Sequence, residues 1–183
     1  MKRPLTLLAQ HAVAQVLKAG DLAIDATAGN GHDTLFLARK VGPQGRVYAF
    51  DIQPQALKNT AQRLRQNKLL ESVQLIQAGH QQLDQHLPHP LPAPLSAAMF
   101  NLGYLPGGDK QVITSASSTL EALDKMLERM TPDGIISILA YRGHPGGQAE
   151  TQAIQDWLDC RELEPEILDS PGPILFLVRP HAF

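Results

Sequence analysis

Ten consecutive residues, Asp25-Ala26-Thr27-Ala28-Gly29-Asn30-Gly31-His32-Asp33-Thr34, separate a short apolar run from a predicted amphipathic helix. The run before them, Leu22-Ala23-Ile24, is typical of a buried strand, and Leu35-Phe36-Leu37-Ala38 begins the helix. The two glycines allow a tight turn and a close approach of the backbone to a ligand. The pattern therefore predicts a strand, a nucleotide-cofactor loop and a helix.

A second predicted strand, residues 46–51, ends on Asp51. At this position of doubly wound folds a carboxylate accepts hydrogen bonds from the hydroxyl groups of a ribose. We therefore assign Asp51 to the ribose and place Ile52 and Gln53, which follow it, in the same cofactor site. The loop supplies the other predicted cofactor contacts, which are Asp25, Thr27, Gly29, Asn30, Gly31, Asp33 and Thr34.

The loop favours S-adenosylmethionine over a dinucleotide. A dinucleotide loop reads Gly-x-Gly-x-x-Gly, and Thr34 stands where its third glycine would let the helix pack on the sheet. Asp25 would also repel a pyrophosphate. S-adenosylmethionine carries an ammonium and a sulfonium group but no phosphate, so Asp25 can face its amino group directly or through water. The alternatives are a nicotinamide cofactor and an ordinary strand-to-helix turn in which Asp33 stabilises the helix N-terminus.

Length and composition fit one domain over residues 1–183, with 43% hydrophobic and 19% charged residues. The net charge of −2 excludes a globally basic nucleic-acid-binding protein and leaves room for a local basic patch. The one cysteine, Cys160, cannot form an intrachain disulfide, and no spacing of Cys and His residues is typical of a zinc site. We therefore expect a cytoplasmic protein without a metal.

The N-terminal segment is predicted to be a helix rather than a signal peptide. Lys2-Arg3 precedes several leucines, but Gln10-His11 interrupts the apolar stretch after a few residues. Pro4 suits the first turn of a helix, and Gly20 is expected to end it. No segment of the sequence approaches the length of a membrane span, so we expect no membrane partner.

Strand and helix patterns alternate along the chain, as in a largely parallel sheet covered by helices on both faces. The predicted strands are 22–26, 46–51, 73–77, 95–101, 135–141, 166–169 and 174–179, and the later predicted helices are 31–41, 54–67, 111–130 and 147–159. Pro171-Gly172-Pro173 joins the last two strands too closely for a helical crossover, so the last strand should run antiparallel. This three-layer, Rossmann-like α/β pattern resembles the class I methyltransferase fold, whose strand order is 3-2-1-4-5-7-6.

The segment after the fourth predicted strand carries two predicted catalytic groups. Asn101 ends an apolar run and Tyr104 follows it, which resembles the Asn-Pro-Pro-Tyr signature of amino-group methyltransferases. In such sites the asparagine oxygen accepts a hydrogen from the amine while the aromatic ring stacks on the base. Here Leu102-Gly103 replaces the two prolines. The alternative is that Asn101 is a turn residue and Tyr104 packs in the core.

The segment after the fifth predicted strand, residues 141–147, is a second candidate. Arg142 can hold a phosphate, and His144 can relay a proton in catalysis because an unperturbed histidine titrates near neutral pH. Alternatively, His144 before Pro145 only shapes a turn. After the third predicted strand, His80 stands where many methyltransferases present an acid to the adenine amino group, so we include it, together with Asn101, among the cofactor contacts.

Three motifs together resemble the YtqB-like (MnmM) family of bacterial proteins, formerly described as rRNA methylases. They are Gly29–Thr34, Asn101–Lys110 and Gly143–Gly147, and the resemblance covers nearly the whole chain. It implies an enzyme that uses S-adenosylmethionine to methylate 5-aminomethyl-2-thiouridine at the wobble position of transfer RNA. It also implies a homodimer that recognises the anticodon stem-loop. The expected substrate contacts are Tyr104, Gly107, Gly108, Lys110, Tyr141, Arg142 and His144.

Local cations are expected to contact the RNA phosphates. The candidates, most of them predicted near loops on the ligand side, are Lys2, Arg3, Arg39, Lys40, Lys110 and Arg142. A further group, expected on an outer helical face, comprises Lys58, Arg63, Arg65 and Lys68. The fold also fits a methyltransferase that acts on ribosomal RNA or on a small metabolite, and a noncatalytic RNA-binding module.

Overall fold

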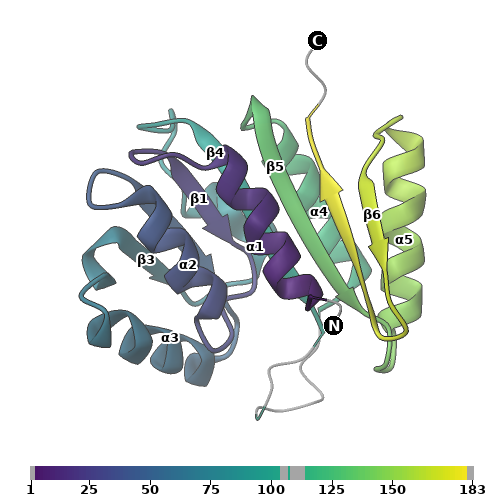
Figure 1. Ribbon diagram of the computed structural model, residues 1–183, viewed down its shortest axis with the longest axis horizontal. Coiled ribbons are helices and arrows are strands. Elements are labelled where there is room, and N and C mark those ends of the chain that lie inside the picture. The colour runs from purple at the N-terminus through teal and green to yellow at the C-terminus, as the bar shows by residue number, and fades with distance from the viewer. Residues whose placement is uncertain (1–2, 104–106, 108–113, 181–183) are drawn as a thin grey trace.

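The computed structural model describes residues 3–103, 107 and 114–180. Seven strands form one sheet in the order β3-β2-β1-β4-β5-β7-β6 (Figure 1). They are β1 Leu22–Asp25, β2 Arg46–Phe50, β3 Val73–Ile76, β4 Leu95–Leu102, β5 Met130–Tyr141, β6 Glu166–Asp169 and β7 Pro173–Val178. β7 pairs antiparallel with β5 and with β6, whereas the other paired strands are parallel. The predicted order and the antiparallel last strand are confirmed.

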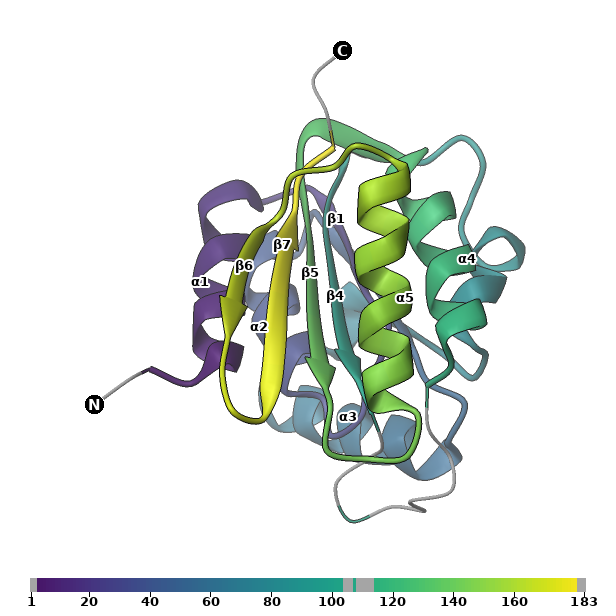
Figure 2. The same cartoon turned by 90° about the vertical axis from the view of Figure 1, so that its right-hand side faces the viewer.

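Helices cover both faces of the sheet, as Figures 1 and 2 show. One face carries α1 Leu5–Val16, α2 His32–Val41 and α3 Pro54–Gln66, and the other carries α4 Ala116–Leu127 and α5 Gly147–Cys160. Successive strand residues point to opposite faces, so Ala23 packs with residues of α1 and α2, while Ile24 packs with residues of α4 and α5. The three-layer prediction is therefore confirmed.

Most predicted element boundaries agree with the structure to within one residue, and the exceptions have physical causes. The helix predicted over 111–130 is observed only over 116–127, where the Ser115 hydroxyl accepts a hydrogen bond from the Ser118 N–H; residues 111–113 lie outside the described ranges. Beyond it, β5 begins at Met130 and not at residue 135 as predicted, because Met130 already pairs with Leu95 of β4. The first helix ends at Val16 and not near Gly20, because Leu17 becomes extended and is buried.

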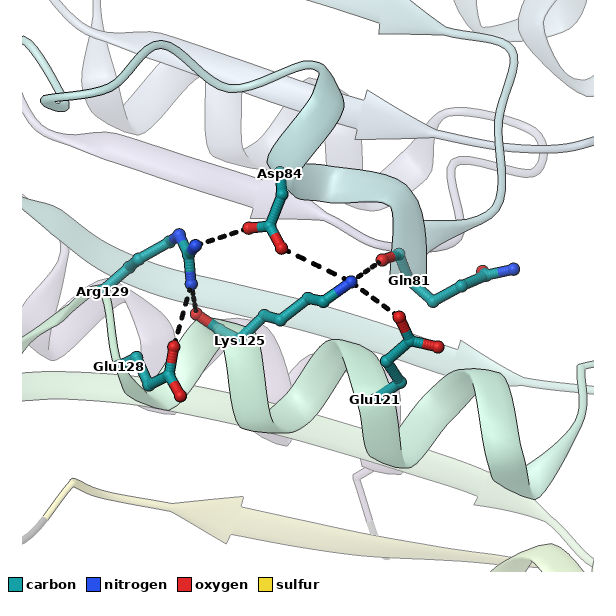
Figure 3. A network of polar contacts seen from close by, with 6 residues as sticks. All are labelled: Gln81, Asp84, Glu121, Lys125, Glu128 and Arg129. Carbon is teal, nitrogen blue, oxygen red and sulfur yellow. Dashed lines mark hydrogen bonds and ion pairs between the residues drawn. The ribbon is translucent and has the colours of Figure 1, made fainter.

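Two short 3-10 helices, η1 Leu70–Ser72 and η2 His80–Gln85, were not predicted. Ionic contacts fasten η2 to α4 (Figure 3). The Asp84 carboxylate lies 2.5 Å from Arg129 Nη2 and 3.4 Å from Lys125 Nζ, which also donates to the Gln81 carbonyl oxygen. Partly exposed ion pairs contribute little singly, but here several converge and hold η2, whose first residue is His80.

The parallel register brings the carboxyl ends of four strands to one edge of the sheet. Asp25 pairs with Ala49 of β2 and Met99 of β4, and Asn101 of β4 pairs with Leu139 of β5. Ligands of open α/β sheets bind outside this edge. The loops that follow β1, β2, β4 and β5 are therefore the place to look for a functional site.

Gly31 brings the loop after β1 into contact with α3. Its φ angle is +77°, and a Cβ atom on this residue would lie 2.9 Å from the Cα atom of Thr60. The Thr60 hydroxyl in turn donates to the carbonyl oxygen of Gly29. The loop and α3 therefore approach each other more closely than a side chain on Gly31 would allow.

We predict that Gly31→Ala lowers the free energy of unfolding by more than Gly20→Ala does. Both glycines have positive φ angles, and an alanine there costs about 1–2 kcal/mol. Only at Gly31 does the new methyl group also meet backbone, because Gly20 faces open space. Urea unfolding of both variants measures the difference. Equal losses would contradict the close approach of the loop to α3.

Candidate functional site at the carboxyl edge of the sheet

Asp25 joins the end of β1 to the beginning of α2. Its side chain has no exposed surface. Oδ1 accepts a hydrogen bond from the Thr27 N–H at 3.1 Å, and Oδ2 accepts one from the Thr34 hydroxyl at 2.6 Å. In this conformation the carboxyl group is closed off from solvent, and a contact with a ligand's amino group, directly or through water, stays a prediction. Asp25 shapes the loop from within.

Three carboxyl groups surround this loop. The pKa of Asp25 is raised to about 7, first by burial and then by the charges of Asp33 and Asp51, against the lowering effect of the hydrogen bonds from Thr34 and Thr27. A cation placed beside the loop would favour the ionised form of Asp25. The electrostatics therefore suit a cationic ligand and oppose a phosphate.

Asp51 lies at the end of β2 with both oxygens on backbone donors. Oδ2 accepts from the Gly29 N–H and Oδ1 from the Gln53 N–H, each at 2.9 Å. Each carboxylate oxygen has a further lone pair, so the group can also accept hydrogen bonds from two hydroxyl groups. Beside it Ile52 is 53% exposed, which leaves an apolar surface for a flat ring.

The middle of the loop is held by α3. Asn30 Oδ1 accepts from the Asn59 amide at 2.8 Å, and its backbone carbonyl accepts from Arg63 Nε at 2.7 Å. The Arg63 guanidinium also lies 3.2 Å from the ring nitrogen Nε2 of His32. Arg63, which was expected on an outer helical face, is half-buried because its side chain turns back onto the loop.

Asn101 is attached to the loop by its backbone and by its side chain. The Asn101 N–H donates to the Thr27 hydroxyl at 2.8 Å, and Nδ2 donates to Oδ2 of Asp33 at 2.7 Å. The other oxygen of Asp33 accepts from the Gln10 amide of α1 at 2.6 Å. The structure thus brings the predicted catalytic Asn101 together with the predicted cofactor loop.

His80 lies beneath the same edge and is only 6% exposed. Its Nδ1 is 3.0 Å from the Ala26 carbonyl oxygen, and its ring meets Phe100 edge-on with centroids 5.4 Å apart. Burial lowers the pKa of His80, so the ring is neutral at pH 7. Its Nδ1 carries the hydrogen and donates the hydrogen bond to the carbonyl oxygen. The ring faces the interior in the place where the sequence suggested an adenine contact.

Arg142 does not extend from the site as a free phosphate ligand. Its guanidinium lies 2.5 Å from the Asp169 carboxylate, and it donates to the carbonyl oxygens of Ser170 and Gly172. The hydrogen bond from Arg142 lowers the pKa of Asp169. The side chain ties the end of β5 to the β6–β7 turn, and the phosphate contact stays a prediction.

The segment after β5 packs on the end of β4. His144 Nδ1 is 3.0 Å from the Pro145 carbonyl oxygen, and a Cβ atom on Gly103 would lie 3.5 Å from His144 Nε2. Tyr141 is 40% exposed, and its pKa is raised first by burial and then by the charge of Asp33. Tyr141 and His144 therefore stand at the same edge as Asn101.

The segment that follows β4 is only partly described. Tyr104, Gly108 and Lys110 lie outside the described residues, as does Lys2, and Gly107 is exposed with a φ angle of +82°. At the base of the segment, the Thr114 N–H donates to the Gly103 carbonyl oxygen at 3.1 Å. Buried Glu150 of α5 accepts from the hydroxyl groups of Thr114 and Thr119, at 2.7 and 2.8 Å.

Gln10, Thr114 and Glu150 were missed by the sequence analysis, and their partners lie 23 to 36 positions away in the chain. No local pattern signals such contacts.

Among the described residues, no group of three or more His, Cys, Asp or Glu side chains is placed to hold a metal ion. In the same part of the chain, no helix is long and apolar enough to cross a membrane.

We predict that Asp25→Asn changes the pH dependence of stability. The pKa of Asp25 is about 7 in the folded protein, above the usual aspartate value of 3.8. Its contribution is therefore fully present below pH 4 and is lost as the pH rises through 7. The wild type should lose about 1.4 kcal/mol per pH unit across this window relative to the variant. Urea unfolding from pH 4 to 8 measures this, and a pH-independent difference would contradict the buried, titrating carboxyl group.

The comparisons with known proteins agree with the fold and with the motifs of the site. The family model described as "Putative rRNA methylase" matches residues 47–168. A chloroplastic tRNA (mnm(5)s(2)U34)-methyltransferase of Arabidopsis thaliana is 37% identical over 87% of this chain, which spans 64% of the length of that protein.

Two solved structures are similar over nearly their whole length. The "putative rRNA-methylase" of Clostridium thermocellum is 35% identical, with 98% of each chain covered and a TM-score of 0.90. A Streptococcus mutans methyltransferase homologue, solved in complex with SAH, is also 35% identical, with 98% of this chain and 99% of that chain covered and a TM-score of 0.82. The chain therefore belongs to the family described as "Putative rRNA methylase".

Proposed function

We propose that residues 1–183 form one methyltransferase domain that transfers a methyl group from S-adenosylmethionine to 5-aminomethyl-2-thiouridine at the tRNA wobble position. The product would be 5-methylaminomethyl-2-thiouridine. The observation that carries this proposal is the attachment of Asn101 to the cofactor loop through Thr27 and Asp33. The similar Arabidopsis protein is named for methylation at this tRNA position, and the similar S. mutans protein binds SAH.

The residues at the edge of the sheet fit S-adenosylmethionine. Asp51 can accept the ribose hydroxyl groups, and exposed Ile52 can cover the adenine ring. Gly29 and Gly31 let the backbone approach the methionine part. The carboxyl groups around the loop favour the ammonium and sulfonium charges, and the same groups disfavour the pyrophosphate of a nicotinamide cofactor.

Asn101 is suited to align an amine. When bound, S-adenosylmethionine supplies an electrophilic methyl group on a positively charged sulfur. Asn101 Oδ1 can accept a hydrogen from the substrate amine and so direct its lone pair toward that methyl group. An alkylamine with a pKa of about 10.4 costs roughly 4–5 kcal/mol to deprotonate at pH 7, and a neighbouring positive charge lowers this cost. We propose that alignment by Asn101 and Tyr104 supplies most of the acceleration, with His144 or water accepting the proton.

The charge distribution supports an RNA partner. Residues 1–80 hold ten of the 16 Lys and Arg residues but only five of the 18 Asp and Glu residues. Within the described part of the chain, the cations of α2 and α3 form no ion pair, whereas Lys125, Arg129, Arg142 and Arg161 all do. We propose that the α2–α3 face, with Arg39, Lys40, Lys58 and Arg65, contacts phosphates of the anticodon stem-loop.

The position of two of these cations corrects the sequence analysis. Arg39 and Lys40 lie in the last turn of α2, whereas the cofactor loop leads into its first turn. They are therefore about 10 Å along the helix axis from the ligand edge and cannot lie at the reacting base. Arg39 and Lys40 are placed to contact phosphates of the RNA stem while the wobble base reaches Asn101.

We also propose a homodimer and a cytoplasmic location, which the resemblance to the YtqB-like family supports.

Nucleoside mass spectrometry tests the proposed substrate. The purified protein and S-adenosylmethionine would be incubated with tRNA that carries 5-aminomethyl-2-thiouridine and, as control, with the same tRNA lacking that modification. We expect a gain of about 14 Da, equal to one CH₂ group, on that nucleoside alone, because Asn101 is placed to align an amine. Methylation of ribosomal RNA or of a small metabolite instead would overturn the tRNA assignment.

We predict that Asn101→Ala lowers kcat at least about 100-fold and changes the affinity for S-adenosylhomocysteine less than about threefold. The reason is that Asn101 Oδ1 would act on the amine, whereas Asp51 and Ile52 would hold the cofactor. Single-turnover kinetics and calorimetry measure the two effects, with Gln152→Ala at an exposed position of α5 as the control. Equal losses in turnover and in affinity would refute the assigned role.

A further inference from the structure

We infer that Asp33 is a positioning residue that fixes the orientation of the Asn101 side-chain amide, and that Gln10 holds Asp33 in place. This inference rests on the proposed function, in which the oxygen of Asn101 faces the amine. It gives Asp33 a role in addition to the cofactor contact expected from the sequence. The three residues come from three elements, α1, α2 and β4.

The three side chains form a continuous chain of hydrogen bonds. Gln10 Nε2 donates to Asp33 Oδ1 at 2.6 Å, and Asn101 Nδ2 donates to Asp33 Oδ2 at 2.7 Å. Asp33 is only 9% exposed and lies in the first turn of α2, where the helix dipole favours a negative charge. Both carboxylate oxygens are therefore engaged by protein donors.

The charge of Asp33 determines which way the amide of Asn101 points. An ionised carboxylate only accepts hydrogen bonds, so Asn101 must turn its NH₂ group toward it. Oδ1 then points away from Asp33, and no described residue donates a hydrogen bond to it. The backbone N–H of Asn101 is bound to the Thr27 hydroxyl, so only the side-chain torsions remain to be fixed. Asp33 thus leaves Asn101 with an acceptor for the substrate amine.

An asparagine at position 33 would remove this constraint. Its amide has one accepting and one donating end, so it cannot accept from both Gln10 and Asn101. If the oxygen of the new asparagine accepts from Gln10, its NH₂ group faces Asn101 and forces the Asn101 amide to flip. The flipped amide would present a donor to the amine, which needs an acceptor.

Turnover and cofactor binding separate a positioning role from a cofactor contact. We expect Asp33→Asn to lower kcat at least about tenfold, with the affinity for S-adenosylhomocysteine changed less than about threefold. Gln10→Ala should lower kcat about threefold or more. The control is Gln15→Ala on the same helix, which should stay within about twofold of wild type. Thermal melting checks that each variant folds.

An exchange of the two residues tests the orientation itself. In the double variant Asp33→Asn, Asn101→Asp, the new asparagine accepts from Gln10 and donates to the new aspartate, whose other oxygen faces the amine. We expect it to be at least about fivefold more active than Asp33→Asn alone. A purely structural role of Asp33 predicts no such rescue, so an exchange variant as inactive as the single variant overturns the inference.

A nuclear magnetic resonance measurement keeps this test separate from that of the proposed function. The side-chain amide signals of Asn101, identified by their absence in Asn101→Asp, should shift in Gln10→Ala and in Asp33→Asn but not in Gln15→Ala. Unmoved signals, or a loss of S-adenosylhomocysteine affinity that equals the loss of turnover, overturn the inference. A wild-type protein that leaves the modified tRNA unmethylated while the signals shift would refute the proposed function and leave the hydrogen-bonded chain established.

Discussion

The carboxyl group of Asp25 is the constraint on which the geometry of the site depends. It is fully buried at the end of β1, and its two oxygens accept from the Thr27 N–H and the Thr34 hydroxyl. These bonds set the path of the loop from the strand to α2. The Thr27 hydroxyl in turn accepts a hydrogen bond from the backbone N–H of Asn101, so the same loop positions the end of β4. A buried polar group without partners is costly, which is why all of these contacts are satisfied together.

The same carboxyl group links the shape of the site to its charge. Asp25 has a pKa of about 7, to which the charges of Asp33 and Asp51 contribute, so it titrates near neutral pH. A cationic ligand would stabilise the ionised form, so binding of the proposed cofactor should release a proton from the loop. Asp51 presents its carboxylate at the cofactor edge, while Asp33 is turned toward Asn101. Asp25, Asp33 and Asp51, which lie in or beside this loop, thus have different roles.

The sequence predicted the sheet order, the loop after β1 and the grouping of Asp51 with that loop, because these depend on local patterns and on the rules of parallel sheets. It could not predict which side chains meet across elements. Arg142 was expected to bind a phosphate but pairs with Asp169, 27 positions away. Gln10 reaches Asp33 from a helix that carried no motif. The first helix was expected to continue to Gly20, but it ends at Val16 because Leu17 is extended and buries its side chain.

The decisive experiment is a crystal structure with S-adenosylhomocysteine and an anticodon stem-loop that carries 5-aminomethyl-2-thiouridine. We expect the amine nitrogen within hydrogen-bond distance of Asn101 Oδ1, with Asn101 Nδ2 still bound to Asp33. We also expect the ribose hydroxyl groups on Asp51 and the RNA stem over the α2–α3 face. An amine bound away from Asn101, or an Asn101 amide with its nitrogen facing the amine, would contradict this expectation.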